Sequence, residues 1–420
     1  MFQSASGGSH VRSRVFITGI GAITPIGIGR KELWSGALAG KRGVKALSRF
    51  DCTDLRSKVA GQIDDFDAVS FLNRKQAQRT ERFSQFAIAA ARLAFDDAAV
   101  TPSGDDPDIG AWIGTALGGV VYAESQYRNY AERGLRGVNP ALALNVFGAS
   151  SCCNVAIHFG LHGPTQSNSN SCAAGAVAIG DAFRAVRDGV CRSALAGGVE
   201  APLAPLTFGA FDIIKSMSTR NGDPGSASRP FDAGRDGFVM SEGACLLYIE
   251  REEDVVARGA VPYAEIAGYG LTNDGDHMTA PREDGREAGR AMTRALREAG
   301  VDAEAVDHVN AHGSSTPLND STESRTIRAV FGAAADRIIV SGTKGMTGHA
   351  LGATGAIEAG LCAMGILENI VVPTINLETP GADCDLRYSP EVPTPLKQGV
   401  VLSNSFGFGG LNAALVFKAA

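Results

Sequence analysis

The feature of this 420-residue sequence that most limits its fold is a set of elements that occurs twice in the same order. Residues 15–21 and 263–270 each read as a strand that ends in a glycine turn. A long helical pattern follows in each case, and after it comes a strand that ends in small residues. These elements cover residues 81–99 and 109–115 in the first half, and residues 286–299 and 306–313 in the second.

The correspondence continues to the end of each half. A helix of small residues begins at a reactive side chain, at Cys172 in the first half and at His349 in the second. Each half is then expected to close on a glycine-rich hairpin, over residues 237–249 and 407–417. Five matching elements indicate an internal duplication, with two unrelated α/β domains as the alternative. Two facing halves would bring the starts of the two helices together.

The duplication predicts an α/β protein with a first half at residues 14–258 and a second half at residues 259–420. Extra sequence over residues 122–156 is expected to cap a site or to make subunit contacts. Residues 1–13 are small and polar, so we interpret them as a flexible start and not as a signal peptide. The most apolar run, residues 350–367, is interrupted by the charged Glu358. We therefore expect no membrane-spanning segment.

Composition narrows the function classes. Apolar residues make up 44% of the chain and charged residues 20%, as in a compact globular protein. The net charge of −6, with both signs interspersed, provides no basic surface typical of a nucleic-acid-binding protein. Eight cysteines are scattered without zinc-like CxxC pairs, so we expect no disulfide framework and a reducing, cytoplasmic location.

Cys172 is the first candidate for chemistry. It follows the polar run Gln166-Ser-Asn-Ser-Asn-Ser and begins a helix rich in Ala and Gly. Its sulfur is therefore expected at a sharp turn beside unpaired helix N–H groups, which favour the thiolate. A cysteine among small residues is otherwise a packing residue, and both interpretations stay open on this pattern.

Two histidines provide the second set of candidates. His312 ends a strand in Asn310-Ala-His-Gly, at the carboxyl edge of a sheet where α/β proteins bind ligands. His349 lies five residues after Lys344 and nine before Glu358, which suggests a buried ion pair beside it, with a helix-surface pair as the alternative. A zinc site built from Cys172 and the histidines is disfavoured because no two ligands are close in sequence.

A glycine-rich loop lies between two strands in Asn404-Ser-Phe-Gly-Phe-Gly-Gly-Leu-Asn. Its backbone N–H groups could form an oxyanion hole, or the loop could be a tight turn only. A strand follows it, whereas a dinucleotide-binding fingerprint requires a helix.

With these motifs in this order, the chain from about Val15 to Phe417 resembles the elongating β-ketoacyl-acyl-carrier-protein synthases, closest to the synthase II type. The resemblance rests on five segments: Ser171-Cys-Ala-Ala-Gly, residues 218–240, Asn310-Ala-His-Gly-Ser-Ser-Thr-Pro, Lys344-Gly-Met-Thr-Gly-His and Asn404-Ser-Phe-Gly-Phe-Gly-Gly. It implies a duplicated thiolase-like fold of α-β-α-β-α layers. It also implies a homodimer that pairs through the strand preceding Cys172.

The resemblance assigns roles to these residues. Cys172 is implied as the nucleophile, with its own N–H and that of Phe408 as the oxyanion hole. His312 and His349 are implied to decarboxylate a malonyl thioester and to stabilise the enolate. Lys344 and Glu358 are implied as the pair that orders the His349 loop.

The resemblance also implies how substrate enters. Leu117 matches an acyl-pocket position, Phe408 a gate, and three hydroxyl residues match the channel that receives phosphopantetheine: Thr279, Ser314 and Thr316. No resident cofactor is implied, since the phosphopantetheine arrives on the acyl carrier protein. Three basic residues match positions that dock this acidic partner: Lys75, Arg79 and Arg220.

Three positions depart from the family pattern. Ser314 stands in place of the usual Thr, Leu411 replaces a Thr after the glycine-rich loop, and Asp276 stands where an aromatic residue is common. Leu411 removes a hydroxyl and is expected to change the hydrogen bonding of the loop. Asp276 is expected to change the channel entrance.

Three other functions are disfavoured by the sequence. A non-catalytic chain-length subunit would lack Cys172, and a condensing enzyme that starts chains from coenzyme A esters would have an Asn in place of His349. A thioesterase-like hydrolase would need a positioned water and no decarboxylating pair.

Overall fold

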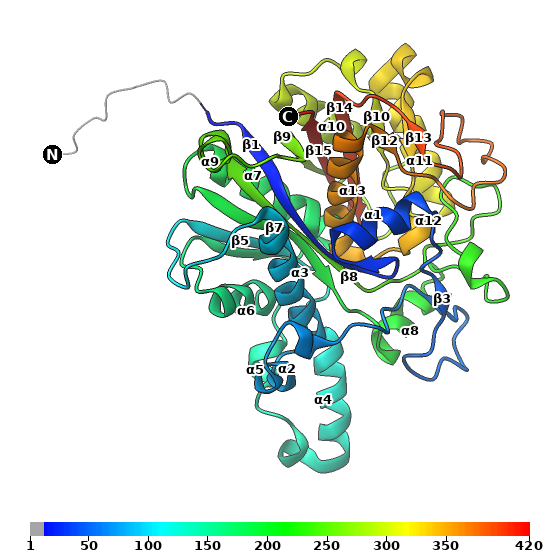
Figure 1. Cartoon of the computed structure of the whole chain (residues 1–420). Coiled ribbons are helices and arrows are strands. Elements are labelled where there is room, and N and C mark those ends of the chain that lie inside the picture. Colours follow the sequence, from blue (N-terminus) through cyan, green and yellow to red (C-terminus); the bar gives the residue numbers. More distant parts are fainter. Residues whose placement is uncertain (1–11) are drawn as a thin grey trace.

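The computed structural model describes residues 12–420, so most of the predicted flexible start at residues 1–13 lies outside the described residues. Its centre is an eleven-stranded mixed sheet (Figure 1). Ten strands follow the order β11-β10-β14-β15-β9-β1-β8-β7-β5-β6, and the short β2 (Gly27–Ile28) pairs with β1 (Val15–Thr24).

The strand order repeats itself about its middle. The five strands of the first half are β1, β8 (Gly243–Arg251), β7 (Ser193–Glu200), β5 (Ile109–Gly114) and β6 (Thr165–Asn168). Their counterparts in the second half are β9 (Ala264–Asn273), β15 (Leu411–Lys418), β14 (Val400–Gly407), β10 (His308–Asn310) and β11 (Ile339–Ser341). Each half has the same order and the same parallel partners, as the predicted duplication requires.

The two halves join where β1 pairs antiparallel with β9, over Val15–Ile17 and Ala264–Ile266. The predicted boundary at residues 258 and 259 falls in the turn between α9 (Glu252–Arg258) and β9.

Helices cover the sheet in layers. α7 (Ala174–Arg187) and α13 (Thr354–Glu368) share the central apolar cluster with β1, β8 and β15. On the outer face of the first half lie α3 (Arg82–Ala98) and α6 (Ser150–Phe159), and on that of the second half lie α10 (Arg286–Ala299) and α11 (Pro317–Phe331). These are the five α-β-α-β-α layers expected from the sequence.

α13 is apolar because it is buried from Thr354 to Ile366. The stretch Leu351–Glu368 has the length and hydropathy of a membrane span, but 89% of it is buried inside the protein. It is therefore accounted for as a core helix.

The prediction of two closing hairpins is half wrong. In the second half, β14 and β15 form a hairpin from Val400 to Lys418. In the first half, β8 pairs antiparallel with β7, but residues 201–242 intervene and include α8 (Pro205–Ile213). The glycine-rich stretch before β8 makes isolated bridges, including Met240 with His349 of the other half.

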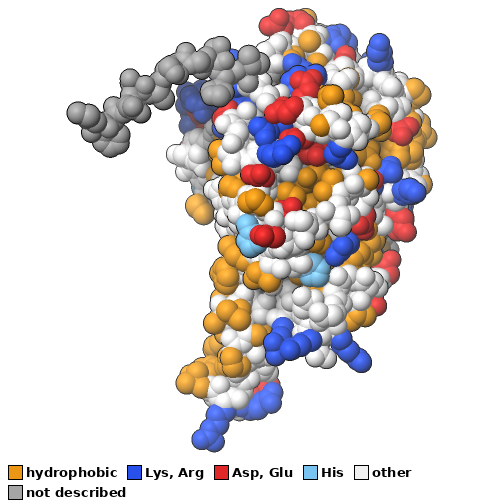
Figure 2. Space-filling model, turned by 60° about the vertical axis from the view of Figure 1, so that its left-hand side comes forward, with side chains coloured by type: hydrophobic (Ala, Val, Ile, Leu, Met, Phe, Trp, Pro, Cys, Tyr) orange, Lys and Arg blue, Asp and Glu red, His pale blue; other side chains and the backbone are white. Residues whose placement is uncertain are grey.

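The extra sequence of the first half projects below the body in Figure 1 as α4 (Val120–Arg133) and α5 (Leu142–Asn145), beside α2 (Arg74–Arg79). It carries several exposed apolar side chains, namely Tyr127, Tyr130, Leu135 and Leu144. Figure 2 shows apolar and basic side chains together on this projecting part.

The remaining elements are short. They are α1 (Arg30–Leu38), α12 (Lys344–Thr347), β3 (Lys45–Ala46), β4 (Val59–Ala60), β12 (Ile370–Val371), β13 (Thr394–Pro395) and the 3₁₀ turns η1 (Ala68–Ser70), η2 (Gly134–Gly137), η3 (Ser171–Ala173), η4 (Pro224–Ser226), η5 (Ala303–Ala305), η6 (Gly332–Asp336) and η7 (Leu351–Ala353).

Candidate active site

Cys172 lies in η3, the tight turn that joins β6 to α7. Ser171 just before it has a φ of 50°, a conformation that non-glycine residues adopt only when the surrounding structure holds them there. The equivalent turn of the second half, η7, contains Leu351 at a φ of 42°. The duplication therefore places matching turns at the starts of α7 and α13.

The two helix starts are in close contact. A Cβ added to Gly175 would lie 2.8 Å from the carbonyl oxygen of Gly352, and one added to Gly355 would lie 3.0 Å from the Cβ of Ala176. Only glycine allows this approach, and it brings Cys172 and His349 into one pocket, as the sequence predicted.

Burial raises the pKa of Cys172 to about 11. A hydrogen bond from Ser171, the charge of Lys344 and the backbone N–H of Phe408 oppose this effect, but they do not outweigh it. The N–H groups at the start of α7 favour the thiolate, whereas burial of the sulfur acts in the opposite direction.

His312 follows β10 and is held through its backbone. Glu323 on α11 accepts hydrogen bonds from the N–H groups of His312 at 2.7 Å and Gly313 at 2.8 Å. The Nζ of Lys344 donates to the carbonyl oxygen of His312. The ring Nδ1 of His312 is buried and has no hydrogen-bond partner among the described residues.

His349 is fixed through both its backbone and its ring. Its N–H donates to the carbonyl oxygen of Val239 at 2.7 Å, and its Nδ1 lies 2.9 Å from the hydroxyl of Thr354. With that hydroxyl as donor, Nδ1 is the acceptor and Nε2 carries the proton.

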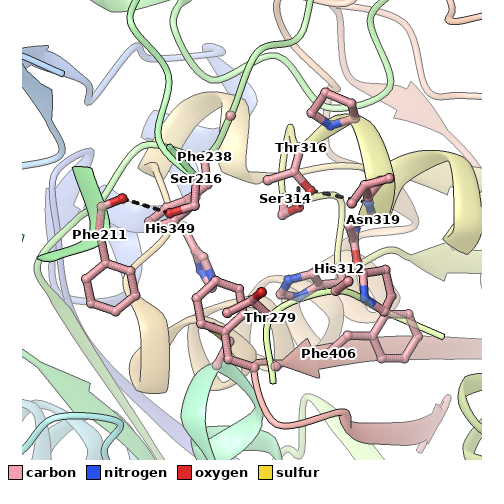
Figure 3. Close-up of a pocket in the computed structure, with 18 of the residues that line it drawn as sticks. Phe211, Ser216, Phe238, Thr279, His312, Ser314, Thr316, Asn319, His349 and Phe406 are labelled. Carbon is pink, nitrogen blue, oxygen red and sulfur yellow. Dashed lines mark hydrogen bonds between the residues drawn. The ribbon is translucent and has the colours of Figure 1, made fainter. Parts of the chain in front are cut away.

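The two imidazoles stand edge to face, with ring centroids 5.3 Å apart and planes at 82° (Figure 3). Burial and the positive charge of Lys344 hold the pKa of both rings well below the ordinary value, and His349 lowers that of His312 further. Both rings are therefore neutral at physiological pH and each can offer an N–H group to a developing negative charge.

Lys344 and Glu358 form the buried ion pair predicted from their spacing, with Nζ and Oε1 2.7 Å apart and both side chains at 1% exposure or less. Thr343 donates to the same carboxylate at 2.8 Å. The pair contacts the backbone of His312 directly, while Lys344 begins the short helix that leads to His349. It thus supports both imidazoles.

These residues line a pocket of about 460 Å³. Its walls are mostly apolar, with aromatic rings from Phe211, Phe238, Phe406 and Phe408. The rings of Phe211 and Phe408 stack at 6.1 Å between centroids. Figure 3 shows the rings of His312 and His349 pointing into the cavity. Thr279, Ser314 and Thr316 line the same cavity, and the hydroxyls of Ser314 and Thr316 lie 2.9 Å apart.

Leu117 lies apart from the open pocket. It belongs to an apolar cluster in which Cys172, Phe208 and Leu351 also pack. It therefore belongs to the apolar packing around Cys172, and it does not line the main pocket with the Ser314 and Thr316 hydroxyls.

The predicted docking residues differ in how far their side chains are exposed. Lys75 and Arg79 are exposed on α2. Arg220 is only partly exposed, and its guanidinium donates to the carbonyl oxygen of Gly234 at 3.1 Å.

The departures from the family pattern lie beside the channel. Leu411 is at the turn of the β14–β15 hairpin, opposite Gly407. Asp276 does not line the main pocket; it lines a shallow hollow with Arg282, Asp284 and Arg325.

Sequence reasoning missed Thr354 and Glu323, which hold the two imidazoles. Thr354 lies five residues after His349, at the first residue of α13, and could have been found from that short separation. Glu323 comes from a different helix, and no local pattern marks it. Across the described residues, no group of three or more His, Cys, Asp and Glu side chains is arranged to hold a metal ion.

Comparisons with known proteins agree with this fold and site. Residues 12–255 match the family model of the β-ketoacyl synthase N-terminal domain, and residues 263–378 match that of the C-terminal domain. The chain is 45% identical to a 3-oxoacyl-[acyl-carrier-protein] synthase 2 of Synechocystis sp. over 97% of its length and 98% of the relative. It is 42% identical to the Staphylococcus aureus protein of that name, over 96% and 98%.

Solved structures give the same result. A β-ketoacyl synthase from Burkholderia phymatum superimposes with a TM-score of 0.91 at 34% identity, covering 97% of this chain and all of that one. A type II polyketide ketosynthase, solved with its acyl carrier protein and bound to a hexaketide, superimposes with a TM-score of 0.90 at 33% identity over 97% and 100%.

The duplicated fold, with a cysteine and two histidines in one pocket, defines a condensing enzyme of the thiolase-like class. The chain belongs to the β-ketoacyl synthase family, as its resemblance implied. Its activity is that of a 3-oxoacyl synthase, an acyltransferase of fatty acid or polyketide synthesis.

Proposed function

We propose that this enzyme extends an acyl chain by two carbons in two half-reactions, with Cys172 as the acyl carrier and His312 and His349 as the decarboxylating pair. The observation that carries the proposal is the placing of the Cys172 turn and two neutral imidazoles around one apolar pocket. The roles of these residues rest on that geometry and on the family resemblance.

In the first half-reaction, the sulfur of Cys172 attacks the thioester carbonyl of an acyl group. The acyl–sulfur bond to the incoming carrier breaks, an acyl–Cys172 thioester forms, and the carrier leaves as a thiol. The N–H groups of Cys172 and Phe408 would stabilise the oxyanion of the tetrahedral intermediate. Gly407, just before Phe408, lies against this turn, since a Cβ added to it would be 3.0 Å from the backbone nitrogen of Cys172, and this closeness supports the assignment.

In the second half-reaction, a malonyl thioester loses its carboxylate as carbon dioxide. The electron pair left behind forms an enolate, whose oxygen accepts hydrogen bonds from His312 and His349. The carbanion carbon then attacks the acyl–Cys172 carbonyl, a carbon–carbon bond forms, and the Cys172 thiolate leaves and is reprotonated. Neutral imidazoles suit this role, because they donate hydrogen bonds without carrying a full charge.

Lys344 and Glu358 position the two histidines and do not contact the substrate in this scheme. Their buried pair holds the backbone of His312 and the start of the His349 loop, and Thr354 holds the His349 tautomer. Ser314, Thr316 and Thr279 would line the path of the phosphopantetheine arm. This arm belongs to the incoming carrier, so the reaction requires no cofactor bound permanently to this chain.

The partner is an acyl carrier protein. The ketosynthase neighbour solved with its carrier protein supports this assignment, as does the name of the relatives. We assign Lys75, Arg79 and Arg220 to its docking. Since Lys75 and Arg79 are exposed, they are the better candidates for long-range attraction of an acidic protein.

The enzyme would act as a homodimer in the cytoplasm. Within residues 12–420, β5 is the one strand that pairs with β6, so the outer edge of β6 is available to a second copy, and the exposed apolar side chains of α4 lie in the same half. Eight free cysteines fit a reducing compartment. Light scattering of the purified protein should give twice the chain mass of 43.5 kDa, whereas a mass of 43.5 kDa would contradict the dimer.

Intact-protein mass spectrometry tests the first half-reaction. The protein is incubated with a panel of acyl carrier proteins that bear short, medium and long chains, and then digested to locate the modified residue. We expect a single acyl group on Cys172, and the chain that accumulates identifies the preferred substrate. An acyl group on any other residue would contradict the proposal.

A further inference from the structure

Glu200 is a buried carboxylate that none of the proposed chemical steps uses. It ends β7 and its exposure is 0%. Its two oxygens accept four hydrogen bonds: from the Thr115 hydroxyl at 3.0 Å, and from the N–H groups of Ala116 at 2.6 Å, Leu117 at 3.1 Å and Gly352 at 3.1 Å. So many bonds to one buried carboxylate fix the segments that donate them.

The donors come from both halves of the molecule. Thr115, Ala116 and Leu117 follow β5 in the first half, whereas Gly352 lies in η7 of the second half. Glu200 therefore joins two segments that no main-chain strand pairing connects.

Both segments contribute side chains to the apolar cluster that also contains Cys172. The Leu117 side chain packs in the apolar cluster that contains the sulfur, and so does Leu351, which precedes Gly352. Leu351 also lines the main pocket and has the strained positive φ described above. The residues that Glu200 holds are thus the apolar wall next to the reacting sulfur.

The packing around this carboxylate leaves no space for adjustment. A Cβ on Gly352 would lie 2.5 Å from the amide nitrogen of Ala116 and 2.8 Å from Oε2 of Glu200. A Cβ on Gly198, two residues before Glu200, would lie 2.3 Å from the carbonyl oxygen of Gly352. A change in the hydrogen bonding of Glu200 must therefore move the Leu117 or the Leu351 segment.

We propose that Glu200 is a positioning residue that sets the shape of the acyl-binding wall, through Leu117 on one side and Leu351 on the other, and so determines which acyl chains react with Cys172. The inference rests on the proposed function, because it assumes that Cys172 carries the chain. The ligand that this wall contacts is the apolar acyl group of the thioester.

The substitution Glu200→Gln tests this inference. A carboxylate only accepts hydrogen bonds, whereas an amide replaces one acceptor oxygen by an N–H donor. The Thr115 hydroxyl can turn to accept, but a backbone N–H cannot. An amide nitrogen in place of Oε1 would leave the N–H of Leu117 without its partner, and one in place of Oε2 would leave those of Ala116 and Gly352 without theirs. Glu250→Gln is the control. Glu250 is a buried carboxylate on β8 that lies opposite Ser193, at the other end of β7, where it pairs with Arg258 and does not line the pocket.

The measurement is the rate of Cys172 acylation by carriers with short, medium and long chains, together with the melting temperature of each variant. For Glu200→Gln we expect kcat/KM for the preferred chain to fall by about 10- to 100-fold, the usual effect of misplacing a reacting group by about 1 Å. We also expect the ratio between long and short chains to change. Glu250→Gln should keep the wild-type ratio.

An unchanged chain-length ratio in Glu200→Gln would overturn the inference and leave Glu200 a stabilising residue only. If this variant does not fold, Thr115→Val removes one of the four donors and should change the ratio in the same direction by less. Wild-type protein that forms no acyl–Cys172 would instead refute the proposed function, so the two failures are distinguishable.

Discussion

At the scale of single residues, the site depends on groups that burial keeps neutral. The pKa of Cys172 is raised to about 11, and those of His312 and His349 are well below their ordinary values. The resting enzyme therefore carries a thiol and two uncharged imidazoles. Deprotonation of the thiol must accompany its attack, and the imidazoles are ready to donate hydrogen bonds.

The division of labour predicts separate effects of the histidines. His312→Ala or His349→Ala removes one donor to the enolate oxygen, and malonyl decarboxylation should lose about 2–4 kcal/mol of transition-state stabilisation. Acylation of Cys172 should be spared, because the N–H groups of Cys172 and Phe408 remain. Both steps can be followed by mass spectrometry of the carrier protein and of the enzyme.

The matched control is His308→Gln. His308 is as buried as the other two histidines, but its ring contacts Gln398 and Ser341 and does not line the pocket. The His308→Gln variant should decarboxylate malonyl carrier protein at a rate within the wild-type range. Equal losses of acylation and decarboxylation in the pocket variants would contradict the separate roles.

The lowered pKa values of the histidines predict a flat pH profile. A histidine whose pKa is held well below 6.5 stays neutral as the pH falls from 8 through 6.5, so no donor is lost in that range. Decarboxylation of malonyl carrier protein by the Cys172→Ala variant should therefore not change between pH 6 and 8. A rate that rises or falls around pH 6.5 would show that an imidazole titrates there.

The sequence identified the reactive side chains but not the groups that hold them. Cys172, His312 and His349 stand at the ends of strands or the starts of helices, where local patterns are informative. Glu323 and Glu200 act on backbone N–H groups of segments far away in the chain, so nothing near them in sequence marks their role. The electrostatic effect of burial on Cys172 likewise depends on the whole fold.

At the scale of elements, the critical contact is that between the starts of α7 and α13. Glycines on α7, β7 and η7 allow the two helix starts to meet at backbone distance. The repeated small-residue helices and their order could be predicted from the sequence. The absence of a hairpin in the first half could not be predicted, because residues 201–242, which separate β7 from β8, have no counterpart in the second half.

Gly198→Ala should destabilise the protein. Its Cβ would lie 2.3 Å from the Gly352 carbonyl oxygen and 2.9 Å from the Cα of Gly175, so the backbone must shift. Overpacking of this kind costs about 1–3 kcal/mol in the free energy of unfolding. Chemical denaturation measures the loss.

Gly222→Ala is the control for this prediction. Nothing lies within 4 Å of a Cβ at that position, so its stability should match that of the wild type. If Gly198→Ala is as stable as Gly222→Ala, the helix starts are not in the tight contact described.

At the scale of the whole molecule, the duplication builds the active site. The first half supplies Cys172, which follows β6, and the second half supplies His312 and His349, which follow β10 and β11. The repeat in the sequence was sufficient to predict α/β layers and helix starts that face each other, and the family resemblance implied the five layers. The shape of the acyl-binding wall required the structure, because it depends on contacts between the halves.

The most direct test of the central claim is the product of one turnover. Acyl carrier protein and malonyl carrier protein are incubated with wild-type enzyme and with Cys172→Ala, and carrier masses are measured. Wild type should yield a 3-oxoacyl carrier two carbons longer, while Cys172→Ala should only decarboxylate the malonyl group. A 3-oxoacyl product from Cys172→Ala, or its absence with the wild type, would contradict this account.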